Sequence, residues 1–184
     1  MVWLWILIAI IVVLVLIVIY YYNKIVVLGN RIDNAFSQID VQLKKRNDLI
    51  PNLVATVKGY ATHEKSVFEN VTKARASMLQ AKGTDAKFKA SDALSNALKS
   101  IFAVAEAYPQ LRANENFKEL QQELSDVESK IAYTRQFFND SVLMYNDTVL
   151  AFPGNVFAGM FGKAQKDYLK TQEAEKKVVN VNFE

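Results

Sequence analysis

The amino-acid sequence predicts an all-α protein, with an N-terminal transmembrane helix followed by an antiparallel, up-and-down four-helix bundle whose first helix is long and kinked. Three observations lead to this prediction. The chain begins with an uninterrupted apolar run, apolar residues then recur at the three- and four-residue spacing of helices, and no credible sheet competes with them. Short loops between amphipathic helices favour antiparallel neighbours.

The apolar run covers residues 2–22 and contains no charged residue, proline or glycine. As a helix it would be about 31 Å long, close to the ~30 Å hydrocarbon core of a bilayer. Aromatic residues suited to the two water interfaces stand at its ends: Trp3, Trp5, Tyr20, Tyr21 and Tyr22. A buried core helix is the alternative, but so long a run is rarely hidden in a globular protein. A cleaved signal peptide would need a basic start and a shorter apolar region, so an uncleaved anchor is the better interpretation.

The charges that follow the anchor predict its orientation. Six basic and three acidic residues lie between residues 23 and 60, whereas the chain from residue 61 onward has sixteen of each. Because Lys and Arg prefer the cytoplasmic side, we expect a single-pass protein of the cell membrane with its N-terminus outside and its C-terminal domain in the cytoplasm. The basic segment suits anionic lipid headgroups. A nucleic-acid partner is not expected, because it would require a larger basic face.

The first soluble helix is predicted to run as far as Gly83, which can adopt a left-handed conformation. Gly29 is the expected flexible point between anchor and domain. A kink is expected between Arg46 and Pro51, because proline removes a backbone donor and crowds the preceding turn.

Two charged residues fall on the apolar seam of this helix. The seam, followed in steps of three and four, reads Ile39, Leu43, Arg46, Ile50, Leu53, Val57, Tyr60, Glu64, Val67 and Val71. Either the helix rotates at Pro51 and exposes Arg46 and Glu64, or each meets an opposite charge on the third helix. The available partners are Glu123, Glu128 and Arg135. A buried charge without a partner would cost several kcal/mol.

Three further helices are predicted over residues 86–107, 117–152 and 155–169. Pro109 ends the second and Pro153-Gly154 ends the third, whose start can be capped by Asn114 or Asn116. The third has a long heptad-like seam, on which Phe138-Asn139-Asp140 is echoed by Tyr145-Asn146-Asp147. A dimeric coiled coil would explain the seam, but its large aromatic and hydroxyl residues favour an intramolecular bundle. The expected domains are the anchor (1–23), the bundle (24–175) and an extended or disordered tail (176–184).

The first and third helices carry more apolar residues than a four-helix core can use, and the fourth helix adds an apolar cluster. Those lying off the seam or clustered on the fourth helix form a candidate interface: Phe137, Val142, Met144, Val149, Phe157, Met160 and Phe161. A large apolar patch on a soluble surface usually marks an interface, so we expect a homo-oligomer. The alternatives are that these residues thicken the core or that the fourth helix lies on the lipid surface.

The residue types that usually carry catalysis are scarce. There is no cysteine and only one histidine, and His63-Glu64 lacks the second histidine of a zinc-protease motif. No glycine-rich phosphate loop is present. We therefore expect no enzyme, no cofactor and no metal site.

A long block of the sequence resembles a known family. Ile39 to Val54, followed by Val57-Lys58-Gly59-Tyr60-Ala61 and His63-Glu64, closely resembles the signature of the bacterial LemA family. Further matching segments are Ala113-Asn114-Glu115-Asn116-Phe117, Lys130-Ile131-Ala132, Arg135-Gln136, Asn139-Asp140, Tyr145-Asn146 and Phe152-Pro153. The resemblance implies a single-pass membrane protein whose soluble part is a four-helix bundle, with no established catalytic residues.

The sequence thus predicts a membrane-anchored, non-enzymatic scaffold that binds other membrane proteins and further copies of itself. The alternative is a membrane-tethered sensor or receptor that binds a small ligand in its helical domain. Such a ligand would require an apolar cavity with a few converging polar groups.

Overall fold

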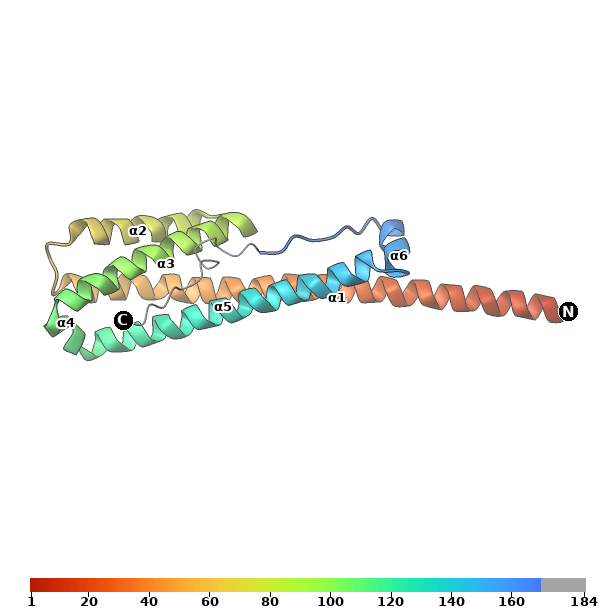
Figure 1. Ribbon diagram of the computed structural model, residues 1–184, viewed down its shortest axis with the longest axis horizontal. Coiled ribbons are helices and arrows are strands. Elements are labelled where there is room, and N and C mark those ends of the chain that lie inside the picture. Colours follow the sequence, from red (N-terminus) through yellow and green to blue (C-terminus); the bar gives the residue numbers. More distant parts are fainter. Residues whose placement is uncertain (170–184) are drawn as a thin grey trace, which may run out of the picture. The chain divides into compact units, whose positions relative to one another are not determined.

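The computed structural model describes residues 1–169, and all regular secondary structure in this range is helical (Figure 1). The helices are α1 (Val2–Lys58), α2 (Lys65–Gln80), α3 (Thr84–Ala107), α4 (Pro109–Ala113), α5 (Glu115–Leu150) and α6 (Gly154–Met160). The predicted all-α class is therefore confirmed for the described chain. The expected tail, residues 176–184, lies outside the described residues.

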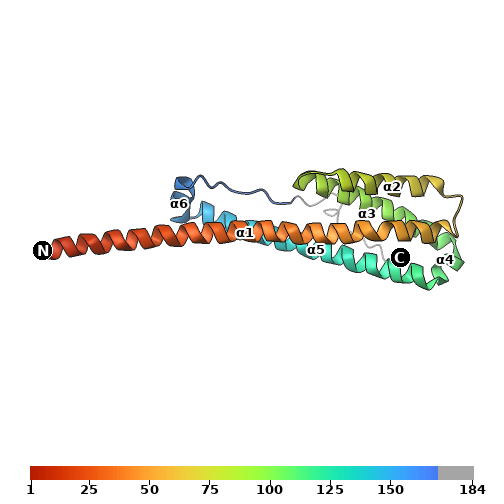
Figure 2. The same cartoon turned by 180° about the vertical axis from the view of Figure 1, so that it is seen from behind.

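Helix α1 contains the whole apolar run and continues without interruption to Lys58 (Figure 2). By length and composition it is a candidate to cross a membrane, and none of its most apolar window is buried. The run is therefore not a core helix of the described chain. Gly29 and Pro51 both lie within the helix, so neither position interrupts it.

The first soluble helix is shorter than predicted. It ends at Lys58, and a turn over residues 59–64 leads to α2, so the helix does not reach Gly83 as one element. The amides of Tyr60 and Ala61 bond to the carbonyl of Val57 at 3.0 and 2.9 Å and close the end of α1. Ala61 is buried, so the apolar spacing continues through the turn although the helix does not.

The fourth helix is also shorter than predicted. Helix α6 ends at Met160, and residues 163–169 have no regular secondary structure. Gly162 has a φ of 62°, a left-handed conformation that glycine adopts readily and that suits the end of a helix. The short helix α4 was not predicted, because Pro109 both follows α3 and occupies the first turn of the next helix.

Two loop predictions agree with the structure. Gly83 has a φ of 81° immediately before α3. The side-chain oxygen of Asn114 accepts a hydrogen bond from the amide of Phe117 at 2.9 Å, in the first turn of α5.

The described helices cluster into two compact units, and α1 and α5 contribute residues to both. The first unit combines Met1–Phe36 with the chain from Arg135 onward, and the second is Ser37–Thr134. The two boundaries between the units, after Phe36 and after Thr134, both lie within residues 24–175, the range expected to form the bundle.

In the second unit, α2 packs along α3. The buried apolar residues of this unit come from α1 to α5 and from the turn after α1: Ile39, Leu43, Ile50, Leu53, Val57, Ala61, Phe68, Val71, Met78, Phe88, Leu94, Leu98, Ile101, Ala105, Leu111, Phe117, Leu124, Val127 and Ile131. Most of them follow the predicted helical spacing, which therefore explains this core.

Candidate functional site

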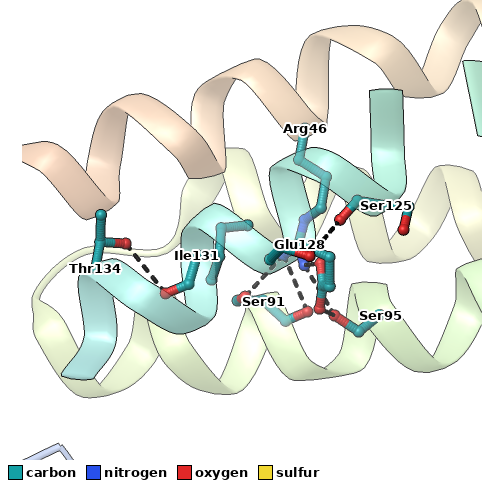
Figure 3. A network of polar contacts seen from close by, with 8 residues as sticks. Arg46, Ser91, Ser95, Ser125, Glu128, Ile131 and Thr134 are labelled. Carbon is teal, nitrogen blue, oxygen red and sulfur yellow. Dashed lines mark hydrogen bonds and ion pairs between the residues drawn. The ribbon is translucent and has the colours of Figure 1, made fainter. Parts of the chain in front are cut away.

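The most connected polar cluster of the second unit is centred on Arg46 of α1 (Figure 3). Its guanidinium is buried, with a side-chain exposure of 1%. Nη1 donates to Oε2 of Glu128 and to the hydroxyl of Ser95, both at 2.8 Å. Nη2 donates to the hydroxyl of Ser91 at 2.7 Å and to its carbonyl at 3.2 Å. The buried charge is therefore paired and supplied with several acceptors.

Three helices supply this cluster. Ser91 and Ser95 are four residues apart and so lie on one face of α3, while Glu128 belongs to α5. The Ser95 hydroxyl accepts from Arg46 and donates to Oε1 of Glu128 at 2.9 Å, so it bridges the two charged groups. The cluster thus links α1, α3 and α5 through charge-assisted hydrogen bonds, which are stronger than neutral ones.

The other charged residues chosen from the sequence lie elsewhere. Glu64 does not occupy a core position: it precedes α2 in the turn, half-buried, because the helix that would have placed it on the seam ends at Lys58. Glu123 lines a separate shallow depression with Asn52 and Asn116. Arg135 belongs to the first unit. Of the proposed partners, only Glu128 is in contact with Arg46 among the described residues.

Sequence reasoning missed the two serines. Ser91 is buried on the apolar face of α3, three residues after Phe88 and three before Leu94. A hydroxyl residue on an apolar stripe was therefore the signal that could have pointed to a polar partner for Arg46.

A hollow of about 310 Å³ opens beside the cluster. Its apolar wall is formed by Leu98, Phe102 and Leu124. Its polar groups are Arg46, Ser95, Lys99, Gln121, Ser125 and Glu128. The volume lies at the lower end of the range for small-molecule sites, and the mixed lining suits a compact molecule with an apolar part and a charged group. No group of three or more metal-binding side chains occurs within residues 1–169.

In the first unit, two asparagines of α5 hold the extended segment 163–169. The side-chain Nδ2 of Asn146 donates to the backbone carbonyl of Lys166, and its Oδ1 accepts from the backbone N–H of Lys166, both at 2.9 Å. Asn139 makes the same pair with Leu169, at 3.3 and 2.8 Å. These are the asparagines of the heptad echo in the sequence, and their seven-residue spacing places them on one face of the helix.

The burial of two valines on α5 corrects part of the predicted interface. Val142 and Val149 each follow one of these asparagines by three residues and therefore lie on the same face of α5. Both valines are buried, with exposures of 0% and 5%, so they belong to the core of the unit and not to a free surface. The sequence had left both an interface and a thicker core open for these valines, and their burial favours the core.

The remaining interface candidates differ in exposure. Phe137 is half-buried under the guanidinium of Arg31, whose Cζ lies 5.1 Å from the ring centroid. Met144 and Met160 are exposed, whereas Phe157 and Phe161 pack against tyrosines of α1.

Comparison with known proteins shows the family. The LemA family profile matches residues 35–183, most of the chain, and this range includes the Arg46 cluster and both asparagines. The chain belongs to the LemA family. The match begins after the apolar run, so it concerns the part of the chain that follows the candidate anchor.

Three curated relatives are magnetosome proteins. Two, MamQ 1 and MamQ 2 of Paramagnetospirillum magneticum, are 24% identical to this LemA protein over 179 residues. MamQ of Magnetospirillum gryphiswaldense is 25% identical over 179 residues. In each case the match covers 83% of this chain and 66% of the relative, slightly less than two thirds of its length.

Proposed function

We propose that this protein is a non-enzymatic scaffold anchored in the cell membrane by α1, and that its helical part binds other membrane proteins and further copies of itself. One observation carries the proposal. The same 57-residue helix contains the exposed apolar run and, further along, the buried Arg46 that ties it to α3 and α5. An anchor that is continuous with a charge-linked core suits a protein whose role is to hold partners at a membrane.

Family membership supports the same proposal. The relatives are named as magnetosome proteins, and a part in organising a membrane-associated assembly agrees with that name. The contacts of α1, α3 and α5 around Arg46, with α2 along α3, also support the proposed antiparallel four-helix arrangement.

Self-association is part of the proposal. Copies fixed by one helix in a common plane have a raised effective concentration, which favours side-by-side contacts. A closed ring about the membrane normal would satisfy such contacts. With Val142 and Val149 buried, the exposed apolar residues next to them on α5, Leu143 and Met144, are the better candidates for this surface.

Crosslinking in native membranes tests self-association, and the absence of cysteine gives a clean background. We expect Met144→Cys to yield a discrete ladder with a short bis-maleimide reagent. Val142→Cys, two residues earlier on the same helix but buried, is the matched control and should remain monomeric. Monomers alone from Met144→Cys, with normal helical content, would mean that this surface does not join copies.

Orientation is proposed from the basic residues that follow the anchor, which favour a cytoplasmic domain. Lys73→Cys on the exposed face of α2 reports it. A membrane-impermeant maleimide added to whole cells should label this cysteine only after the membrane is opened. Labelling of Lys73→Cys in intact cells would place α2, and with it the domain that follows the anchor, outside the cell.

The hollow beside Arg46 supports a second candidate function, a tethered sensor for a small ligand. Light scattering on the detergent-purified full chain separates the two functions. A mixture of defined oligomers supports the scaffold. A strict monomer whose thermal midpoint rises with small amphipathic ions, and does so less after Lys99→Ala at the hollow, supports the sensor.

A further inference from the structure

The short helix α6 and the residues beside it present distinct faces. Gly154 and Ala158 are buried, and Phe157 and Phe161 turn toward α1. A third set at four-residue spacing is apolar and exposed; we call it the α6 stripe: Phe152 (84% exposed), Val156 (52%) and Met160 (66%). These large side chains are not used by the core of the described chain.

Helix α6 is fixed to one level of α1. The Phe157 ring stacks on Tyr21, with centroids 5.0 Å apart and planes inclined by 19°. The Phe161 ring meets Tyr22 edge to face at the same centroid distance. Gly154 lies so close to α5 that a Cβ built on it would be 2.0 Å from the carbonyl oxygen of Thr148 and 3.3 Å from the Tyr21 ring. The position of α6 along α1 is therefore determined by close packing.

That level is the end of the apolar run. Tyr21 and Tyr22 are its last residues, and tyrosines prefer the boundary between hydrocarbon and water. Figures 1 and 2 show α6 beside α1, with the apolar part of the helix extending past it. When α1 spans a bilayer with its tyrosines at the interface, α6 is held at the same interface.

Charged residues close to α6 fit the same location. Lys24 is exposed on α1 just past Tyr22, and Lys163 is exposed just past α6. Basic side chains at this depth are attracted to anionic lipid headgroups. Apolar groups next to the end of a spanning helix, followed by lysines, make up the pattern of an interfacial segment.

We propose that α6 is an interfacial helix whose stripe inserts between the headgroups and the first part of the acyl chains of the bilayer that α1 crosses. The inference rests on the proposed anchoring by α1. A bilayer is favoured over a second copy as the occupant because Phe157 and Phe161 hold α6 at the last residues of the exposed apolar run, the part of α1 that lipids would cover. Insertion would give the first unit a second attachment and fix the rotation of α1 about its axis.

The test uses the full chain in nanodiscs of phosphatidylcholine and phosphatidylglycerol, with single cysteines carrying the environment-sensitive fluorophore NBD. Met160→Cys reports the stripe, and Val12→Cys reports the middle of the anchor. Asn155→Cys is the matched control on α6, exposed but outside the stripe, and Lys73→Cys on α2 reports the second unit. Each variant is measured with ordinary lipids and with lipids brominated on the acyl chains, and its helical content is checked by circular dichroism.

We expect brominated lipids to quench NBD at Met160 and at Val12 by at least half, to quench Asn155 clearly less, and to leave Lys73 unchanged. Quenching at Val12 without quenching at Met160, whose emission stays that of water, overturns the inference and leaves the anchor intact. A blue-shifted but unquenched Met160 means that protein, such as a second copy, covers the stripe, and it also overturns the inference. An unquenched Val12 means that α1 does not span the bilayer, and the proposed function fails with it.

Discussion

Arg46 and Glu128 form an ion pair at 2.8 Å in which one side chain is buried and the other half exposed, with exposures of 1% and 51%. The desolvation cost therefore falls mainly on the guanidinium. Ser91 and Ser95 supply acceptors to both terminal nitrogens of the guanidinium, whose Nε has no partner among the described residues, and the carboxylate remains in contact with water. Removing the arginine and removing the carboxylate should consequently have different effects.

The first prediction concerns this asymmetry. Arg46→Ala should destabilise the protein by about 3 kcal/mol, because it leaves a cavity and unpaired polar groups within the core. Glu128→Gln should cost less, roughly 1 kcal/mol, because the amide oxygen can still accept from Arg46 and the NH2 group can donate to the hydroxyl of Ser95, while the charge is lost. Urea unfolding of the full chain in detergent, followed by circular dichroism, measures both.

Two charged residues outside the core serve as controls for this pair. Lys44→Ala breaks a solvent-exposed pair with Asp48 within α1, and Glu64→Ala removes a half-buried carboxylate from the turn before α2. Each should change the free energy of unfolding by less than ~0.5 kcal/mol. Equal losses from Arg46→Ala and Lys44→Ala would show that the cluster does not stabilise the core.

The sequence left open whether Arg46 and Glu64 on the apolar seam are buried or exposed, and one reason explains why Arg46 is buried and Glu64 is not. Periodicity reports which side chains are apolar at helical spacing, and Ala61 keeps that spacing although the helix ends at Lys58. The apolar seam of α1 therefore predicts which side chains are buried as far as the end of the helix, which includes Arg46. Within the turn that follows it no longer predicts burial, as Glu64 shows. The partner Glu128 could be named from the sequence as one of the acidic residues on the third predicted helix, opposite in charge to Arg46.

The burial of Val142 could not be predicted in the same way. Val142 lies three residues after Asn139, on the side of α5 where Asn139 and Asn146 bind the backbone of Leu169 and Lys166, in a segment without regular secondary structure. Hydrogen bonds to the backbone place no constraint on the side chains of the bound segment, so its sequence carries no pattern that predicts the contact. Only Asn139 and Asn146 could be recognised in the sequence, because they repeat at a spacing of seven residues.

The second prediction tests those asparagines. Asn146→Ala removes both hydrogen bonds to the backbone of Lys166, and two bonds of this kind contribute on the order of 2 kcal/mol. We expect the amide of Lys166 to exchange its hydrogen at least tenfold faster. Trypsin should also cleave after Lys163 and Lys166 at a higher rate.

Asn155→Ala is the matched control, because Asn155 is an exposed asparagine of the same unit. Its exchange and cleavage should equal those of the unaltered protein. Unchanged exchange at Lys166 in Asn146→Ala would contradict the role given to Asn146.

The third prediction compares two glycines of α6. A Cβ at position 154 would lie 2.0 Å from the carbonyl oxygen of Thr148, whereas at position 159 it would meet nothing within 4 Å. Gly154→Ala should therefore cost roughly 1–3 kcal/mol through overpacking. Gly159→Ala should be neutral or stabilise by up to ~1 kcal/mol, because alanine is the better helix former. Urea unfolding distinguishes them, and similar midpoints would mean that α6 does not pack closely on α5.

The last prediction concerns Tyr145, which is buried in the first unit with the ammonium of Lys166 5.6 Å from its ring centroid. Burial raises the pKa of its hydroxyl above the ordinary 10.0, because the charged phenolate is poorly solvated there. Below pH 10 the hydroxyl is protonated in the folded and the unfolded chain, and it adds no pH dependence. Above pH 10 the unfolded chain releases the proton first, so stability falls as pH rises toward the pKa of the folded state.

Tyr145→Phe should remove this part of the alkaline loss of stability. It should also delete a late-ionising component from the ultraviolet titration of the eight tyrosines in the folded protein. The measurement is the difference between the two titrations at matched protein concentration, with Tyr133→Phe as the exposed control. If Tyr145→Phe deletes a component that ionises together with the exposed tyrosines, the hydroxyl is hydrated and the first unit is more open than its packing indicates.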